Sequence, residues 1–211
     1  MRLTKFGHAC VRIEHDGHTV VIDPGGFTDP EAVDGADAVL VTHLHADHFD
    51  PGNLRRTDVP IFTIDEVARQ AADNAPDLTE RITVVTPGDR FEAAGLTVRA
   101  VGELHAVIHP DLPRNFNCGY VLTLGETKVF HPGDALTPPD EPVDVLGVVV
   151  SAPWMRAAEA VDFARLVGAP RNIAIHDRVY SDAGLGIVDG HLQRLLPEGQ
   201  DYVRLADGSD L

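Results

Sequence analysis

The chain carries one pattern twice: a hairpin-like stretch, a Pro-Gly pair, and then a buried apolar run. Cys10 to Gly26 (CVRIEHDGHTVVIDPGG) aligns without a gap on Cys118 to Asp134 (CGYVLTLGETKVFHPGD). An apolar run follows each stretch at the same offset, Ala38 to Val41 and then Leu146 to Val150. Any two hairpins that turn at glycine look partly alike, but a register kept through the next strand favours a duplication. The identical pairs are Cys10/Cys118, Gly17/Gly125, Thr19/Thr127, Val21/Val129, Pro24/Pro132 and Gly25/Gly133.

Each half continues with a helical pattern, Asp65 to Ala72 and Arg156 to Val167. The apolar runs are continuous rather than alternating, which is typical of strands covered on both faces. We therefore predict an α/β fold in which two similar halves form a four-layer αββα sandwich, a single domain over residues 1–211. The remaining expected strands are Leu3 to Glu14, Thr19 to Ile22, Val59 to Thr63, Arg81 to Val85, Arg90 to Ala93, Leu96 to Val101, Thr127 to Phe130 and Asn172 to Ile175.

Composition narrows the possible partners. The 33 acidic residues outnumber the 17 basic ones and give a formal charge of -16, which repels phosphate backbones and disfavours extended nucleic acid. No apolar run approaches the roughly 20 residues of a membrane helix. Glycine and histidine also interrupt the N-terminal segment, so we expect a cytoplasmic protein without a membrane partner. Two cysteines are too few for a disulfide framework and are expected to be buried thiols.

A histidine-rich segment, Thr42-His43-Leu44-His45-Ala46-Asp47-His48, directly follows the buried run that ends at Val41. His43 and His45 are two apart on an extended strand end, so they project the same way and can hold one ion. Asp47 and His48 follow in the loop and can turn toward a second ion. Burying such a cluster without metal would leave several polar groups unpaired. Imidazole and carboxylate ligands suit zinc, manganese or iron.

Other candidate residues stand at the ends of expected strands, where a sandwich gathers its loops along one edge. They are His105, Asp134 and His176. Asp23 also follows a strand. Its carboxylate could accept the free ring N–H of a ligand histidine, or it could only form an Asp-Pro-Gly turn.

The remaining histidines divide by context. His8 and His109 are candidates to line the pocket, and His131 could orient Asp134. His15, His18 and His191 are expected in solvent.

The motif H-x-H-x-D-H after a strand resembles that of the metallo-β-lactamase-fold hydrolases. Further segments resemble the ascorbate-6-phosphate-lactonase-like branch of that family and cover almost the whole chain in the expected order. They are Gly7-His8-Ala9 with Asp23-Pro24, Thr86-Pro87-Gly88-Asp89 through Gly95-Leu96-Thr97-Val98 to His105, Asn117-Cys118-Gly119-Tyr120, His131-Pro132-Gly133-Asp134 and Asn172 to His176. The chain departs from the branch at Ser151-Ala152-Pro153-Trp154 and at Asp177, which follows the last histidine.

This resemblance implies a centre of two divalent ions, zinc first, with manganese or iron as alternatives. His43, His45 and His105 would hold one ion; Asp47, His48 and His176 would hold the other, and Asp134 would bridge them. Hydroxide formed at the metals would attack the substrate, and Asp47 and Asp134 would be the catalytic carboxylates.

The expected function is a metal-dependent hydrolase of a small-molecule ester, lactone or phosphate-containing substrate. A phosphodiesterase or nuclease of the same fold is the first alternative. A diiron oxidoreductase is less favoured, because such relatives place Glu at the second motif position, where this chain has His45. A non-catalytic metal-binding module is also possible, although no ligand is missing here.

Overall fold

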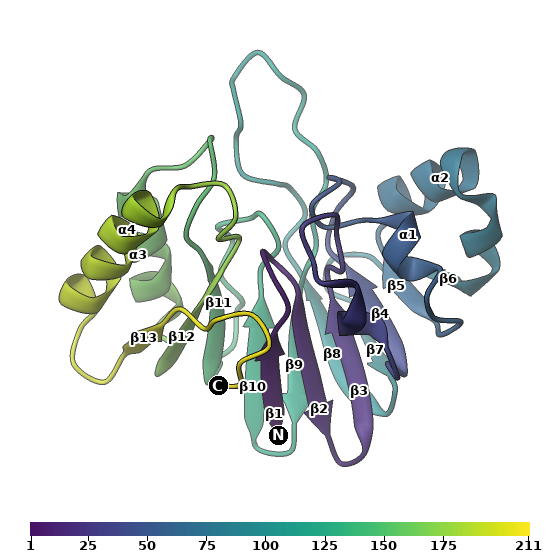
Figure 1. The fold of residues 1–211 in the computed structure, drawn as a ribbon, viewed down its shortest axis with the longest axis horizontal. Coiled ribbons are helices and arrows are strands. Elements are labelled where there is room, and N and C mark those ends of the chain that lie inside the picture. The colour runs from purple at the N-terminus through teal and green to yellow at the C-terminus, as the bar shows by residue number, and fades with distance from the viewer.

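Two mixed β-sheets lie face to face in the computed structural model, which covers residues 1–211 (Figure 1). The first sheet has the order β1-β2-β3-β4-β5-β6, and the second has the order β13-β12-β11-β10-β9-β8-β7. The strands are β1 (Arg2–Lys5), β2 (Val11–His15), β3 (His18–Ile22), β4 (Ala38–Val41), β5 (Ile61–Thr63), β6 (Ile82–Val84), β7 (Arg90–Ala93), β8 (Leu96–Val101), β9 (Gly119–Leu124), β10 (Thr127–His131), β11 (Val145–Val149), β12 (Arg171–Ile175) and β13 (Asp201–Val203).

The two sheets repeat one topology. From β1 to β6 the pairings run antiparallel, antiparallel, parallel, parallel and parallel. The strands from β8 to β13 pair in the same succession, and β7 is added at the edge. The order and direction of the strands are therefore those expected of a duplicated unit.

The residue register differs between the two repeats. The first hairpin turns at Asp16-Gly17, and Val11 pairs with Ile22. The second hairpin turns one position later in the alignment, at Gly125-Glu126, so Phe130 pairs with Val121 rather than with Gly119. The ungapped alignment thus identifies equivalent strands without giving their exact pairing.

Helices cover the outer faces, so the predicted four-layer arrangement is confirmed (Figure 1). The helices α1 (Pro51–Leu54) and α2 (Asp65–Asn74) lie on the side of β4 to β6. The helices α3 (Ala157–Val167) and α4 (Asp182–Leu195) lie on the side of β11 to β13. Two short 3₁₀ helices, Pro30–Val33 and Pro76–Arg81, complete the connections. None of these helices has both the length and the apolar character needed to cross a bilayer.

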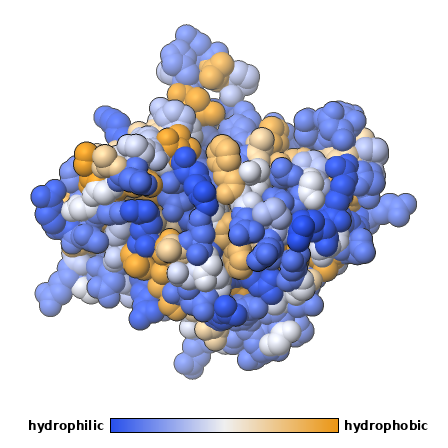
Figure 2. Space-filling view, viewed as in Figure 1, coloured by the Kyte–Doolittle hydropathy of each residue, from blue (hydrophilic) through white to orange (hydrophobic).

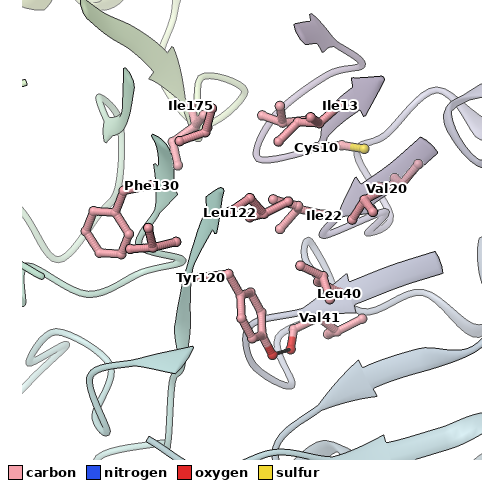
Figure 3. Close-up of a cluster of buried hydrophobic side chains, with 14 of the residues drawn as sticks. Cys10, Ile13, Val20, Ile22, Leu40, Val41, Tyr120, Leu122, Phe130 and Ile175 are labelled. Atoms are coloured by element: carbon pink, nitrogen blue, oxygen red, sulfur yellow. Dashed lines mark hydrogen bonds between the residues drawn. The ribbon is translucent and has the colours of Figure 1, made fainter. Parts of the chain in front are cut away.

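The hydrophobic core forms one cluster of 54 buried residues, which includes the facing sides of the sheets and the buried sides of α3 and α4. Figure 3 shows Tyr120 and Leu122 of β9 facing Ile22 and Leu40 of the first sheet. The buried hydroxyl of Tyr120 donates a hydrogen bond of 2.9 Å to the carbonyl oxygen of Val41. This bond satisfies the phenol and joins the two sheets just before the histidine-rich segment begins.

The expected strand from Leu3 to Glu14 is wrong in one respect, because a turn divides it into β1 and β2. The N–H of Phe6 donates to the carbonyl of Cys10, and that of Cys10 donates to Gly7. Gly7 has φ +94° and His8 has φ +47°, conformations that end an extended strand. The turn carries His8 to the edge of the sandwich at which β4, β8, β10 and β12 end.

Candidate metal centre

The histidine-rich segment leaves the end of β4 at this edge and supplies ligands to two neighbouring groups. In the first group, the possible ligand atoms of His43, His45, His105 and Asp134 lie within 4.8 Å of one another. In the second group, those of His8, Asp47, His48 and His176 are equally close. The structure therefore brings together all seven residues that the sequence indicated as ligands, and it places His8 beside Asp47 in the second group.

Asp134 lies between the two groups. Its Oδ2 is 3.4 Å from Nε2 of His105 in the first group and 3.1 Å from Nε2 of His176 in the second. Its Oδ1 is 3.3 Å from Nε2 of His48. One carboxylate therefore reaches both groups, as the predicted bridging position requires.

Four of the histidines direct Nε2 toward the centre, because their Nδ1 is hydrogen-bonded to an oxygen atom elsewhere. Nδ1 of His105 donates to the carbonyl oxygen of Ala106 at 2.7 Å, and Nδ1 of His176 donates to that of Ser151. Nδ1 of His43 lies 3.0 Å from the hydroxyl of Thr42, and Nδ1 of His48 lies 2.7 Å from Oδ2 of Asp23. Each contact holds the ring through Nδ1 and leaves Nε2 facing inward, where it could bind an ion.

Asp23 occupies the supporting position that we expected from its place after a strand. It is fully buried, and it also accepts hydrogen bonds of 2.7 Å from the backbone N–H and the hydroxyl of Thr42. Its φ of +51° places it in the left-handed region at the tight turn after β3. Asp23 thus orients His48 and also fixes the residue that precedes His43.

The three other histidine candidates have different surroundings. His8 is fully buried, and its Nε2 lies 2.9 Å from Oδ2 of Asp47. His131 is buried below the centre; its Nε2 donates to the carbonyl oxygen of Ala9, and its Nδ1 accepts the N–H of Gly133, next to Asp134. His109 lies in the loop between β8 and β9, its side chain is 60% exposed, and it belongs to neither group.

Two glycines allow the loops to approach closely. A Cβ on Gly25 would lie 2.0 Å from the backbone of Asp47, and one on Gly133 would lie 2.4 Å from Oδ1 of Asn117. These glycines occupy equivalent positions in the two repeats, in Asp-Pro-Gly and His-Pro-Gly respectively. The duplicated Pro-Gly pair thus lets each hairpin pack against a segment that carries ligands.

Two asparagines support the centre in roles that the sequence did not reveal. Oδ1 of Asn117 accepts the backbone N–H of Asp134 at 2.9 Å, and the amide of Asn115 lies 2.9 Å from Nε2 of His45. Both belong to the loop after His105. Asn117 was visible only as part of a segment that resembles the family, and no spacing rule connects Asn115 to the histidine-rich segment.

The residues fit a bound cation. Nε2 of His48, Nε2 of His105 and Oδ1 of Asp134 are buried without a hydrogen-bond partner, although buried polar atoms normally have one. Burial lowers the pKa of His176, but the negative charge of Asp134 and hydrogen bonds with Asp134 and Asp47 outweigh this effect and raise the pKa to about 9. The carboxylates therefore favour positive charge here, and imidazole nitrogen and carboxylate oxygen are ligands that transition-metal ions accept.

Known proteins resemble this chain in both sequence and fold. A family model described as the β-lactamase superfamily domain matches residues 2–176. Protein Rv0786c of Mycobacterium tuberculosis is 40% identical over 203 residues, which are 92% of each chain. The UPF0173 metal-dependent hydrolase MK1542 of Methanopyrus kandleri is 31% identical over 64% of this chain and 62% of its own length.

Solved structures share the fold at lower sequence identity. Igni18, a metallo hydrolase of Ignicoccus hospitalis, superposes with a TM-score of 0.75 at 18% identity and covers 100% of this chain and 97% of its own. The metallo-β-lactamase fold protein YhfI of Bacillus subtilis gives a TM-score of 0.72 at 17% identity, with 100% and 98% covered. At these identities the likeness concerns the fold alone.

Proposed function

Because this chain belongs to the metallo-β-lactamase superfamily and is a metal-dependent hydrolase, we propose that it uses two divalent ions to hydrolyse a small ester, lactone or phosphate-containing molecule. One observation carries the proposal: two groups of four candidate residues lie side by side, and Asp134 contacts both. Zinc suits these ligands first, and manganese or iron would also fit.

The protein's part in the reaction is to hold its ligands in place before any substrate arrives. Carbonyl and hydroxyl oxygens fix the rings of His43, His105 and His176. Little reorganisation is then needed during the reaction, which is how a preorganised site lowers a barrier. A pair of ions in such a centre supplies a nucleophile at neutral pH by lowering the pKa of water from 15.7 toward about 7.

Asp47 and Asp134 are suited to different tasks. The side chain of Asp134 is 2% exposed, whereas that of Asp47 is 22% exposed and therefore meets the substrate side of the centre. Burial raises the pKa of Asp47, but hydrogen bonds with His176 and His8 outweigh this effect and hold it well below its usual value. Asp47 thus stays a carboxylate, which can orient the attacking water by accepting a hydrogen bond from it.

A small substrate agrees with the charge of the chain. The formal charge of -16 opposes the approach of a polynucleotide, whereas a small molecule meets mainly the local field of the centre. The resemblance to the ascorbate-6-phosphate-lactonase-like branch adds lactones to the candidates. That finer assignment stays a prediction.

Metal analysis and a substrate panel test the proposal together. The purified protein should contain close to two transition-metal ions per chain by elemental mass spectrometry. It should hydrolyse at least one class among esters, lactones, thioesters and phosphodiesters, and removal of metal with a chelator should abolish that activity reversibly. An active protein without metal would refute the mechanism.

Substitutions then localise the activity. His45→Ala and Asp134→Ala should abolish hydrolysis while circular dichroism shows an intact fold. His109→Ala is the matched control, because His109 is 60% exposed and outside both groups. Full activity in both site variants would place the reaction elsewhere.

A further inference from the structure

Arg114 is held beside a proposed metal ligand without a partner of opposite charge. It belongs to the loop between β8 and β9, which projects from the edge of the sandwich (Figure 1). Its Nε and one terminal nitrogen donate to the carbonyl oxygen of His105, at 2.9 and 2.6 Å. Acidic residues outnumber basic ones by 33 to 17, yet no carboxylate lies within ion-pair distance of this guanidinium. Because a carbonyl oxygen is neutral, the positive charge of Arg114 is not balanced.

The two hydrogen bonds to His105 use only one edge of the guanidinium. An arginine side chain has five N–H donors, so three remain, and two of these lie side by side at the end of the group. Such a pair matches two oxygens of a carboxylate or a phosphate, which arginine binds in bidentate fashion. The anchored edge also limits the side-chain freedom that would be lost when an anion binds.

Arg114 lines a hollow next to the centre. The hollow has a volume of about 280 Å³. Whole ligands usually occupy about 300–1,000 Å³, so this volume suits one arm of a larger molecule. Another lining residue, Trp154, has its ring centroid 5.2 Å from that of His105. The apolar walls come from Leu104, Ala106, Val107, Leu136 and Trp154.

The acidic residue of this hollow is already paired. Oε2 of Glu159 accepts the backbone N–H of Arg156 at the start of α3, at 2.7 Å, and Oε1 lies 3.4 Å from the guanidinium of the same residue. The hollow therefore combines apolar walls with a positive charge that has no counter-charge. Figure 2 shows the same mixture on the projecting loop, where hydrophobic and hydrophilic atoms lie beside one another.

The other hollows at this edge offer no such cation. A cavity of about 460 Å³ between α2 and the loop after β8 contains Arg69, which pairs with Asp65 at 2.5 Å. A hollow after β3 contains Arg178, which pairs with Asp207. Arg114 is thus the one basic residue in these three hollows without a carboxylate partner.

We infer that Arg114 binds an anionic group of the substrate, a carboxylate or a phosphate, while the scissile bond lies at the metal centre. The inference rests on the proposed function and narrows it to esters and lactones that carry such a group away from the scissile bond. In that reaction the water oxygen bonds to the carbonyl carbon and the carbon–oxygen bond breaks. The leaving alcohol takes up a proton, and the anionic group is unchanged.

Binding without turnover tests the inference. Trp154 is the single tryptophan of the chain, so its fluorescence reports on the hollow. Phenylacetate and benzylphosphonate carry a carboxylate and a phosphonate, the latter in place of phosphate, and phenylacetamide is their uncharged counterpart. At least one anion should change the emission saturably and bind about tenfold more tightly than the amide. The tighter anion identifies the group, whereas an amide that binds as well as both anions, or no binding at all, would overturn the inference.

Variants measured by calorimetry locate the bound anion. Arg114→Gln should weaken binding of the preferred anion about tenfold, the loss expected for a charged hydrogen-bonded pair. Arg165→Gln is the matched control, because Arg165 also donates from Nε and a terminal nitrogen to one carbonyl oxygen, that of Leu195, but lines none of these hollows. Unchanged anion binding in Arg114→Gln would place the anion elsewhere, for example on the metal ions, and would overturn the inference.

Two further measurements separate direct contact from an effect through His105. The ring of His105 is held by the carbonyl oxygen of Ala106, so the metal content of Arg114→Gln, by elemental mass spectrometry, should equal that of the unaltered protein. A lower content would show that Arg114 positions the ligand instead. Arg114→Lys keeps the charge and should retain more anion affinity than Arg114→Gln. Equal losses in the two variants would contradict a role for the charge.

The inference and the proposed function can fail separately. Ethyl acetate and γ-butyrolactone test the chemistry without an anionic group, and monoethyl succinate tests it with one. Hydrolysis of any of these, without an anion preference in probe binding, would leave the function and overturn the inference. An anion preference that depends on Arg114, without hydrolysis of any ester or lactone, would leave the binding site and remove the function.

Discussion

Nε2 of His8 lies 2.9 Å from Oδ2 of Asp47, across 39 residues of sequence. The backbone N–H of Arg178 donates to Nδ1 of the same ring at 3.2 Å, so the ring proton sits on Nε2 and points at the carboxylate. Burial lowers the pKa of His8 to about 4, which keeps the ring neutral at pH 7. His8 therefore donates a hydrogen bond to Oδ2 of Asp47, and Oδ1 is left to bind a metal ion or water.

Replacing His8 should weaken the second group of ligands. We expect His8→Asn, which tolerates the left-handed backbone at this turn but is too short to reach Asp47, to lose about 10–100-fold in metal affinity or activity. Metal titration against a chromophoric chelator should show weaker binding of one of the two ions. His109→Asn should behave like the unaltered protein, and equal affinities in the two variants would show that His8 is dispensable.

Asp23 should affect metal affinity and not only the stability of the fold. Asp23→Asn also keeps a residue that tolerates left-handed φ, but its amide no longer offers two carboxylate oxygens to Thr42 and His48. Metal affinity should fall by about 10–100-fold. The control is Asp37→Asn, because Asp37 also accepts a backbone N–H, that of Thr19 at 2.8 Å, but lies away from the centre. A similar loss of affinity in both variants would point to a general effect on folding.

Local spacing made the core of the centre predictable. His43, His45, Asp47 and His48 are adjacent in sequence, and the positions of His105, Asp134 and His176 follow from strand ends that share one edge. A position beside an expected strand did not by itself distinguish His8 from His109. Both stand beside expected strands, yet only the turn at Gly7, which divides the first strand, carries His8 inward. A glycine inside a strand pattern was the available signal for that bend.

Pairing between distant segments could not be predicted. The alignment of the repeats identified equivalent strands, but each turn decided its own register, at Asp16-Gly17 and at Gly125-Glu126. The residue after the last histidine is a second example. Asp177 is a point at which the chain departs from the branch that it resembles, and the structure shows its partner, Lys5 of β1, at 2.8 Å. No local pattern connects residues 172 positions apart.

The buried pair of Lys5 and Asp177 should matter for stability. The side chain of Lys5 is 0% exposed, and that of Asp177 is 10% exposed. Asp177→Asn should lower the free energy of unfolding by about 3 kcal/mol in urea denaturation. The reason is that the buried ammonium of Lys5 loses the negative charge of its nearest carboxylate. Adding Lys5→Met should recover part of that loss. The exposed pair of Arg55 and Asp77, also 2.8 Å apart, is the control, and Asp77→Asn should change stability little.

The two thiols should be inert until the protein unfolds. Burial raises the pKa of Cys10 above its usual value and that of Cys118 to about 12. Iodoacetamide attacks thiolates, so at pH 8 mass spectrometry should find no alkylation of the native protein. Both thiols should react in urea, where roughly a quarter of free thiols are ionised.

The same thiols should make stability depend on pH. Because the pKa of each thiol is higher in the folded protein than in the unfolded chain, the thiols stabilise the fold below about pH 8.5, and this contribution falls as pH rises toward 12. Cys118→Ala should therefore lose less stability than the unaltered protein between pH 8 and pH 10, and rapid native alkylation would contradict the buried positions.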